Sequence, residues 1–184
     1  MYQYLGASSM LTTAHRALGI PPEFAAQFGD APLVSVGFYG VWVGDLLFKT
    51  SKLRTAASFE KILNAYPSSR IFENWRFMAQ FGYYVAEQES NKPKGLKAYP
   101  FLGYSWNLYY IDNSVRMSIL SVDGGAGADW FIPQTPVLVG VQASYNHSWN
   151  LSAAKEVVNN VSGLSIKAHI AIFIFEKKNP FGWN

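Results

Sequence analysis

The sequence predicts a single α+β domain, in which N-terminal helices pack on a mostly antiparallel β-sheet of four to six strands. Apolar residues recur at helical spacing up to residue 97, alternation with a period of two follows, and no linker rich in Pro, Gly or Ser divides the 184 residues. We therefore expect one domain over 1–184, mainly helical over 1–97 with one strand near 33–48, and mainly β over 98–184.

Segments with apolar residues three and four positions apart are predicted to form helices over 8–18, 23–28, 53–66, 69–85 and 151–161. Gly19 is a typical residue just beyond a helix end, and Pro67 stops the third helix. Ser69 is placed to cap the fourth, whose apolar stripe is wide enough to be covered on two sides.

Segments with alternating side chains are predicted to form strands over 32–48, 105–111, 115–122, 136–145 and 164–175. The second and third form a hairpin around Asp112, Asn113 and Ser114, which are turn-forming residues. In the last strand the apolar set is expected to be buried: Leu164, Ile166, Ala168, Ile170, Ile172 and Ile174. Its opposite face starts with the polar residues Ser165, Lys167 and His169.

A membrane helix is the alternative for the segment that begins at Ala31. The uncharged run ends before Asp45 and is 14 residues long, shorter than the roughly 20 that a bilayer requires. A strand bent at Gly40 is therefore favoured, and a membrane is not expected as a partner.

Composition excludes several functional classes. The chain has no cysteine, which excludes disulfide frameworks, thiolate nucleophiles and iron–sulfur ligation. The net charge is +3, but Lys and Arg are spread along the chain, so nucleic acid is not expected as a partner. Met1 is followed by Tyr2, Gln3 and Tyr4 and not by a basic segment with an apolar core, so cytoplasmic synthesis without a signal peptide is expected.

No motif for catalysis, cofactor binding or metal binding is found. His15, His147 and His169 occur in different predicted elements, and none has a second ligand at helical spacing. The glycine-rich segment 124–129 matches one copy of a calcium-binding repeat that needs tandem copies, so a flexible strand connection is expected. Asp112, Asp123 and Asp129 are expected to close turns, and the protein is not expected to be an enzyme.

The segment 98–154 is unusually poor in charge and rich in aromatic residues. It holds four charged residues, Asp112, Arg116, Asp123 and Asp129, together with ten aromatic residues. Low charge with abundant Tyr and Trp is typical of the buried part of a protein–protein interface. A two-sided core and an aromatic ligand pocket are the alternatives.

We therefore predict a structural subunit of a large assembly whose partners are other protein subunits, most concretely a virion component such as a phage tail, neck or baseplate protein. The candidate interface residues are Trp106, Tyr109, Trp130, Phe131, Tyr145, Trp149, Phe181 and Trp183. The strand edges at 137–141 and 166–175 are candidates for sheet extension between subunits. The alternatives are a soluble protein that binds a small molecule in an aromatic pocket, an enzyme with dispersed acid–base groups, and a membrane-associated subunit using 31–48.

Overall fold

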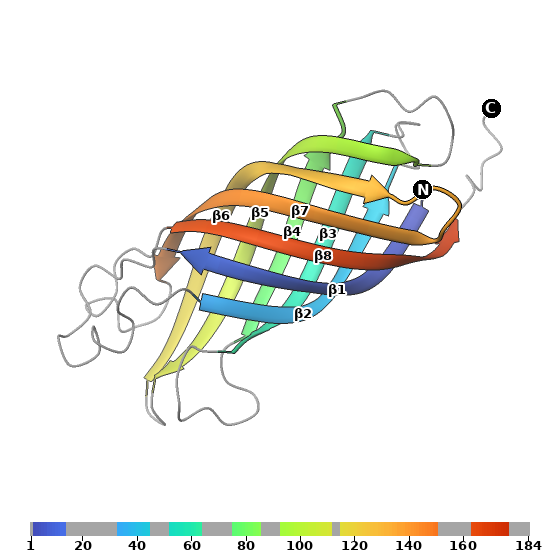
Figure 1. Cartoon of the computed structure of the whole chain (residues 1–184). Helices are drawn as coiled ribbons and strands as arrows, with labels where there is room; N and C mark the ends of the chain where they lie inside the picture. The colour runs from blue at the N-terminus through green and yellow to red at the C-terminus, as the bar shows by residue number, and fades with distance from the viewer. Residues whose placement is uncertain are drawn as a thin grey trace, which may run out of the picture.

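The computed structural model describes residues 2–13, 33–44, 52–63, 75–85, 93–111, 115–150 and 163–176. These residues form eight strands that close into one antiparallel barrel (Figure 1). The strands are β1 (Tyr2–Thr13), β2 (Leu33–Val43), β3 (Leu53–Ile62), β4 (Trp75–Tyr83), β5 (Gly95–Ile111), β6 (Val115–Phe131), β7 (Val137–Asn150) and β8 (Gly163–Glu176).

Each strand pairs with the next along the chain, and β8 returns to pair with β1. The closing ladder places Gly6 opposite Ala171 and Ser9 opposite Ala168, with one register shift between Gln3 and Tyr4. An eight-stranded barrel is narrow enough for side chains to fill its interior. The space enclosed by the strands is called the lumen below.

The two ends of the barrel carry different connections. β1 begins where β8 ends, since Tyr2 pairs with Glu176, and this is called the terminal end. The segments 44–52, 84–94 and 132–136 join strands there, whereas 14–32, 63–74, 112–114 and 151–162 join strands at the opposite end.

The β5–β6 hairpin is longer than its neighbours, with 17 residues in each strand. β4 accompanies β5 only as far as Leu108, the partner of Trp75, and β7 accompanies β6 only from Ile119, the partner of Asn150. The hairpin therefore extends past both neighbouring strands at the opposite end (Figure 1).

Side chains alternate between the lumen and the outside of the barrel, as the period of a strand requires. In β3 every second residue from Arg54 to Ile62 is buried. In β8 the expected faces are reversed: Ser165, Lys167 and His169 are buried in the lumen, and the apolar set from Leu164 to Ile174 faces outward. The alternation was predicted, but the side that is covered was wrong.

The expected helical N-terminal part, and with it the α+β fold, is wrong. The described residues contain no helix, and β1, β3 and β4 take up parts of the expected helices 8–18, 53–66 and 69–85. The cause is that these strands carry apolar residues on both faces: in β3, Leu53 faces outward and Ala56 faces the lumen. Spacings of three and four then arise by chance between the two faces.

The remaining expected elements are strands, a glycine-rich connection and two further helices. The expected strand near 33–48 is β2, and those over 105–111, 115–122, 136–145 and 164–175 overlap β5 to β8. The glycine-rich segment 124–129 is part of β6 and not a flexible connection. The expected helices 23–28 and 151–161 lie outside the described residues. Within the described residues, no helix is long and apolar enough to cross a membrane.

Apolar and aromatic side chains fill the terminal end of the lumen. Tyr4 packs edge-on against Phe131 and Phe173, with ring centroids 5.5 and 5.7 Å apart. The buried cluster consists of Tyr2, Tyr4, Tyr39, Val41, Val43, Ala56, Tyr84, Tyr99, Phe101, Phe131, Leu138 and Ala171. This cluster is the apolar core of the barrel, and polar side chains occupy the lumen beyond it.

Candidate functional site

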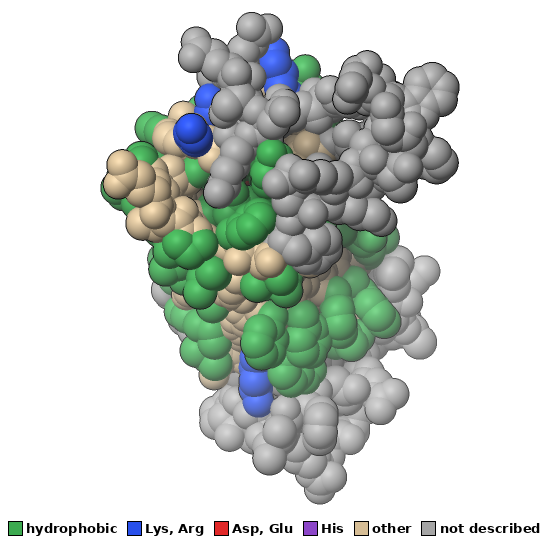
Figure 2. All heavy atoms as spheres, turned by 90° about the vertical axis from the view of Figure 1, so that its right-hand side faces the viewer, with side chains coloured by type: hydrophobic (Ala, Val, Ile, Leu, Met, Phe, Trp, Pro, Cys, Tyr) green, Lys and Arg blue, Asp and Glu red, His purple; other side chains and the backbone are tan. Residues whose placement is uncertain are grey.

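The outside of the barrel is apolar. None of the exposed positions within the described strands carries a charged side chain. We call this surface the outer belt; its large exposed aliphatic and phenylalanine side chains are Leu5, Leu11, Val36, Phe38, Phe77, Phe81, Leu96, Leu102, Val122, Val139, Val141, Leu164, Ile166, Ile170, Ile172 and Ile174. On the face shown in Figure 2, hydrophobic side chains cover much of the described surface. The belt far exceeds the scattered exposed apolar residues of soluble proteins.

Tyr and Trp side chains on the outside gather toward the two edges of the outer belt. At the terminal end, Trp42, Tyr83 and Trp130 occupy the last or next-to-last positions of β2, β4 and β6. Toward the opposite end, the outward rings include Trp75, Trp106, Tyr145 and Trp149. The middle of the belt is therefore aliphatic for the most part, and rings with a polar group mark its borders.

Two lysines lie at these borders. Lys52 Nζ lies 5.9 Å from the centroid of the Tyr83 ring at the terminal end. Lys61 Nζ lies 5.8 Å from the centroid of the Trp75 ring at the opposite end. Each ammonium group thus sits beside a border ring, where a long side chain can direct its charge away from the apolar surface.

The lumen contains the charged side chains that the outer belt lacks. Asp129 is fully buried, and its Oδ2 accepts hydrogen bonds from Arg54 Nε at 2.6 Å and Tyr84 OH at 2.6 Å. Its Oδ1 accepts one from Tyr99 OH at 3.1 Å and lies 2.8 Å from His169 Nε2. Four side chains from four strands or strand ends therefore converge on one carboxylate.

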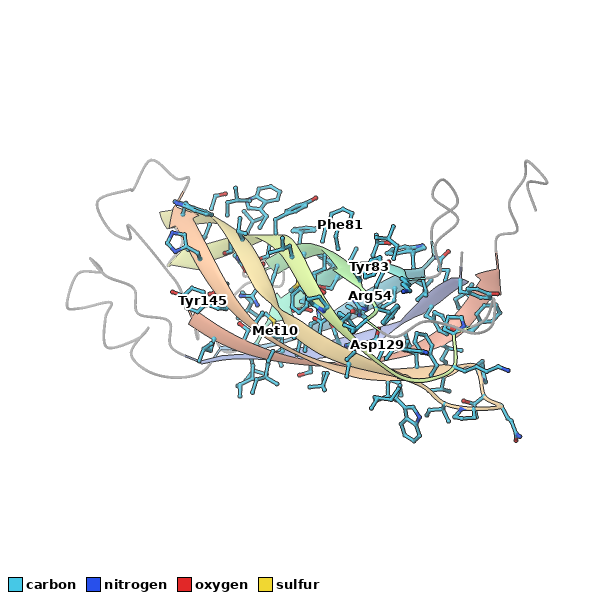
Figure 3. The ribbon with its side chains drawn as sticks, turned by 90° about the horizontal axis from the view of Figure 1, so that it is seen from above. Met10, Arg54, Phe81, Tyr83, Asp129 and Tyr145 are labelled. Atoms are coloured by element: carbon cyan, nitrogen blue, oxygen red, sulfur yellow. The ribbon has the colours of Figure 1, made fainter. Side chains whose placement is uncertain are left out.

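Arg54 has further contacts in this cluster. Its guanidinium donates to Tyr39 OH and lies 4.1 Å from the centroid of the Tyr99 ring. Gln142 Nε2 donates to Tyr99 OH at 2.9 Å and to Gln80 Oε1 at 3.0 Å. Figure 3 shows Arg54 and Asp129 inside the ribbon, whereas Phe81, Tyr83 and Tyr145 lie on its outside.

A second polar cluster lies closer to the opposite end. Glu60 Oε1 is 2.5 Å from Lys167 Nζ and accepts a hydrogen bond from Ser8 Oγ at 2.9 Å. Its Oε2 accepts one from Ser35 Oγ at 2.7 Å, and Lys167 Nζ also donates to Ser58 Oγ at 2.8 Å. A buried charge pair is tolerated when additional hydrogen bonds of this kind satisfy it.

These contacts cross the lumen. Arg54 on β3 reaches Asp129 on β6, and Lys167 on β8 reaches Glu60 on β3, although neither pair of strands is adjacent in the barrel. The buried cations of the described lumen are Arg54, Arg76 and Lys167, and the buried anions are Glu60, Asp123 and Asp129. Opposite charges are therefore balanced among the described residues, and two ion pairs cross the lumen.

A glycine makes room for the first cluster. A Cβ at Gly140 on β7 would lie 2.2 Å from His169 Nε2 and 2.5 Å from Asp129 Oδ1, closer than real contacts allow. A larger residue would push the His169 ring or the Asp129 carboxylate out of place. Glycine at this position is therefore required by the buried cluster and not by a turn.

The predicted interface residues do not share one environment. Trp106, Trp130, Tyr145 and Trp149 are exposed on the outside, whereas Phe131 is buried in the lumen with 3% of its surface exposed. The side chain of Tyr109 lies outside the described residues, as do Phe181 and Trp183. That the exposed rings contact another protein stays a prediction.

Sequence reasoning missed the residues of the lumen. Asp123 and Asp129, expected in turns, point into the lumen from β6. Arg54 and Glu60 were not singled out, and Lys167 was placed on the face opposite the one expected to be buried. A signal was present: Arg54 and Glu60 are an even number of positions apart, so they share one face of a strand whose other face is largely apolar. Groups of three or more His, Asp or Glu that fit a metal ion are absent from the described residues.

No protein-family model and no curated protein matches the sequence. Solved structures do match. Neisserial surface protein A is similar in structure, with a TM-score of 0.62 and 15% identity over 94% of this chain and 97% of that chain. This chain has the same fold. The N-terminal beta-barrel domain of Pseudomonas aeruginosa OprF also matches, with a TM-score of 0.45 and 13% identity over 92% of this chain and 99% of that domain.

The expected function and location are corrected by the fold and its surface. A virion subunit such as a phage tail, neck or baseplate protein is wrong, because the exposed rings belong to an apolar belt around a closed barrel, which is the fold of Neisserial surface protein A. A soluble protein with an aromatic ligand pocket is not supported either. A cytoplasmic location is wrong because it would leave the whole outer belt in water.

The fit at Gly140 is tested by substitution. Gly140→Ala is expected to lower the free energy of unfolding by about 1–3 kcal/mol, because the added methyl group overlaps His169 and Asp129. Gly124→Ala is the matched control, since its Cβ would meet only Leu102 Cδ2, at an ordinary 3.5 Å. Urea unfolding midpoints measure both, and equal losses for the two variants would contradict the assigned packing.

The ion pair across the lumen is tested by a double-mutant cycle. Asp129→Ala is expected to cost about 3–5 kcal/mol of stability, because it leaves the buried Arg54 guanidinium without its anion. Adding Arg54→Met to this variant is expected to restore part of the loss, since the uncompensated charge is then removed as well. If the double variant loses the sum of the two single losses, the two side chains do not interact.

Proposed function

We propose that the chain is an integral membrane protein whose barrel crosses a bilayer, in the manner of outer-membrane barrels. The observation that carries the proposal is the reversed polarity of the barrel, with charged side chains buried in the lumen and an uncharged, apolar outer belt. In water, the exposed side chains would forgo about 1.5–3 kcal/mol each for full burial, and the reversal would be unfavourable. Against lipid tails the same arrangement is favourable.

The dimensions and borders of the belt support the proposal. A tilted strand of about 9–11 residues crosses the hydrocarbon core of a bilayer, and the strands here have 9 to 17 residues. Amphipathic rings such as Trp42, Tyr83 and Trp149 at the edges match the interfacial positions that Trp and Tyr occupy in membrane barrels. Lys52 and Lys61 lie beside border rings, where headgroups and water are within reach of their ammonium groups.

A closed sheet also satisfies the backbone hydrogen bonding that the bilayer core requires. Backbone groups in hydrocarbon must be hydrogen-bonded, and closure of β1 on β8 provides every strand with two neighbours. The proposed role is that of a membrane-anchored barrel, which holds the connecting segments at the two membrane surfaces. Association with other protein subunits and the absence of a nucleic-acid partner stay predictions.

The lipid contact is tested with a charge in the middle of the outer belt. Val141→Arg, at a position 51% exposed, is expected to lower folding stability in phospholipid vesicles by about 2–4 kcal/mol, because the guanidinium is placed among lipid tails. Leu96→Arg, at the second position of β5, is the matched control and is expected to cost about 0–1 kcal/mol. In a soluble barrel both substitutions would leave stability nearly unchanged, and that result would contradict the proposal.

The two ion pairs across the lumen predict that the reconstituted protein does not conduct ions. Single-channel recording in planar bilayers is expected to show no steps at concentrations where a general porin, as positive control, gives stable currents. The reason is that the Arg54–Asp129 and Lys167–Glu60 contacts cross the lumen at two levels. Long-lived conductance steps from the folded barrel would show that these contacts do not close it.

A further inference from the structure

A wide groove lies on the outside of the barrel, over β1 and the strands to either side of it. Its volume is about 1490 Å³, and its lining includes Phe38, Gly40, Ala57 and Phe59. Gly40 and Ala57 are cross-strand partners in β2 and β3, and their small size keeps the surface low between them. A Cβ at Gly40 would lie 3.0 Å from the Trp42 ring, so a side chain there would fill part of the groove.

Aromatic rings stand along one side of this groove. Phe38 on β2 is 77% exposed and is the cross-strand partner of Phe59 on β3. The Phe59 ring stacks on the Trp75 ring, with centroids 4.3 Å apart and 5° between the planes, and lies 4.8 Å from the Phe77 ring. Phe59 therefore joins the groove to rings on β4. Such rings offer a large apolar contact area to a hydrocarbon chain.

A cation lies where this row of residues meets the border of the outer belt. Lys61 pairs with Val36, which lines the groove, on one side and with Trp75 on the other. Its Nζ lies 5.8 Å from the centroid of the Trp75 ring. The outward-facing residues of β2, β3 and β4 include no Asp or Glu. The groove is therefore complementary to an occupant with an apolar body and a negative group at the border.

The distance from this cation to the floor of the groove is close to the depth of one lipid leaflet. Ala57 is four residues from Lys61 along β3, about 13 Å at about 3.3 Å per residue. Half of the hydrocarbon thickness of a bilayer, which is about 30 Å, is roughly 15 Å. A lipid with its phosphate group at Lys61 would thus place its acyl chains beside Phe59 and Ala57.

A second copy of the chain is the competing occupant of the groove. Two copies joined here by a two-fold axis along the membrane normal would present the same patch to each other. Both Lys61 ammonium groups would then meet at the same border, where like charges repel. An anionic lipid brings the opposite charge to Lys61, so the charge at the end of the groove favours the lipid.

We propose that this groove binds one anionic phospholipid, with the phosphate group at Lys61 and the acyl chains along Phe38, Phe59 and Ala57. The inference rests on the proposed function, because a barrel presents this face to lipid only when it crosses a bilayer. It adds one class of lipid and one place on the outer belt where that lipid is held.

Native mass spectrometry of the folded full-length barrel with added lipid tests the role of the charge. Dioleoyl phosphatidylglycerol is expected to bind about fivefold more tightly than dioleoyl phosphatidylcholine, which has the same chains but no net charge. Lys61→Gln is expected to remove this preference and Lys61→Arg to keep it. Lys52→Gln, beside Tyr83 at the other border, is the matched control and is expected to change nothing. Equal affinities for the two lipids in the natural protein, or equal effects of the two Lys→Gln changes, would overturn the proposal.

A second pair of variants tests the groove itself. Ala57→Leu fills the floor and is expected to weaken binding of both lipids at least about fivefold, because the acyl chains lose their contact with it. Ala143→Leu is the matched control, since Ala143 is exposed on β7 and does not line the groove. Equal effects of the two variants would show that the lipid binds elsewhere. A dimer of the natural protein that Ala57→Leu separates would assign the groove to a second copy and overturn the proposal.

Failure of this inference can be told apart from failure of the proposed function. If the barrel does not cross a bilayer, Val141→Arg leaves its stability nearly unchanged. If it crosses the bilayer but has no site for an anionic lipid, Val141→Arg is destabilising, and the natural protein binds the two lipids equally.

Discussion

Because β1 pairs with β8, the barrel can carry charged side chains inside and apolar side chains outside, the reverse of a soluble protein. An open sheet with an apolar outer face would present unpaired edges, whereas closure leaves no edge among the described strands and satisfies the backbone within the sheet. Side chains alone then decide what each surface contacts. The outer belt, the polar lumen and the rings at the borders all depend on this closure.

Side-chain contacts between strands, including strands that are not neighbours in the barrel, hold the interior. Asp129 collects donors from β3, β5 and β8 and from Tyr84 at the end of β4, and Glu60 collects them from β1, β2 and β8. These contacts fix the strands across the lumen, as the ladder fixes them around it. Gly140 shows how closely the backbone ladder and the contacts across the lumen fit together, because a single methyl group there would displace the cluster.

The sequence predicted where side chains alternate along a strand, but not which face of the strand is buried. Alternation along 164–175 and the hairpin around 112–114 were predictable from period and turn residues, and so was the shortage of charge in 98–154. Periodicity cannot tell which face is covered, so Ile166 was assigned inward and Lys167 outward when the reverse holds. The lumen cluster was hidden because its members are far apart in sequence, as with Arg54 and Asp129.

The surplus length of the β5–β6 hairpin also has a consequence. Beyond Leu108 and Ile119 the two strands pair, among the described residues, only with each other, so this ribbon extends past the other described strands at the opposite end (Figure 1). A peptide tag inserted between Ile111 and Val115 would extend from the tip of this ribbon, at a distance from the lumen and the belt alike. Antibody binding to intact cells would then reveal which end of the barrel points outward.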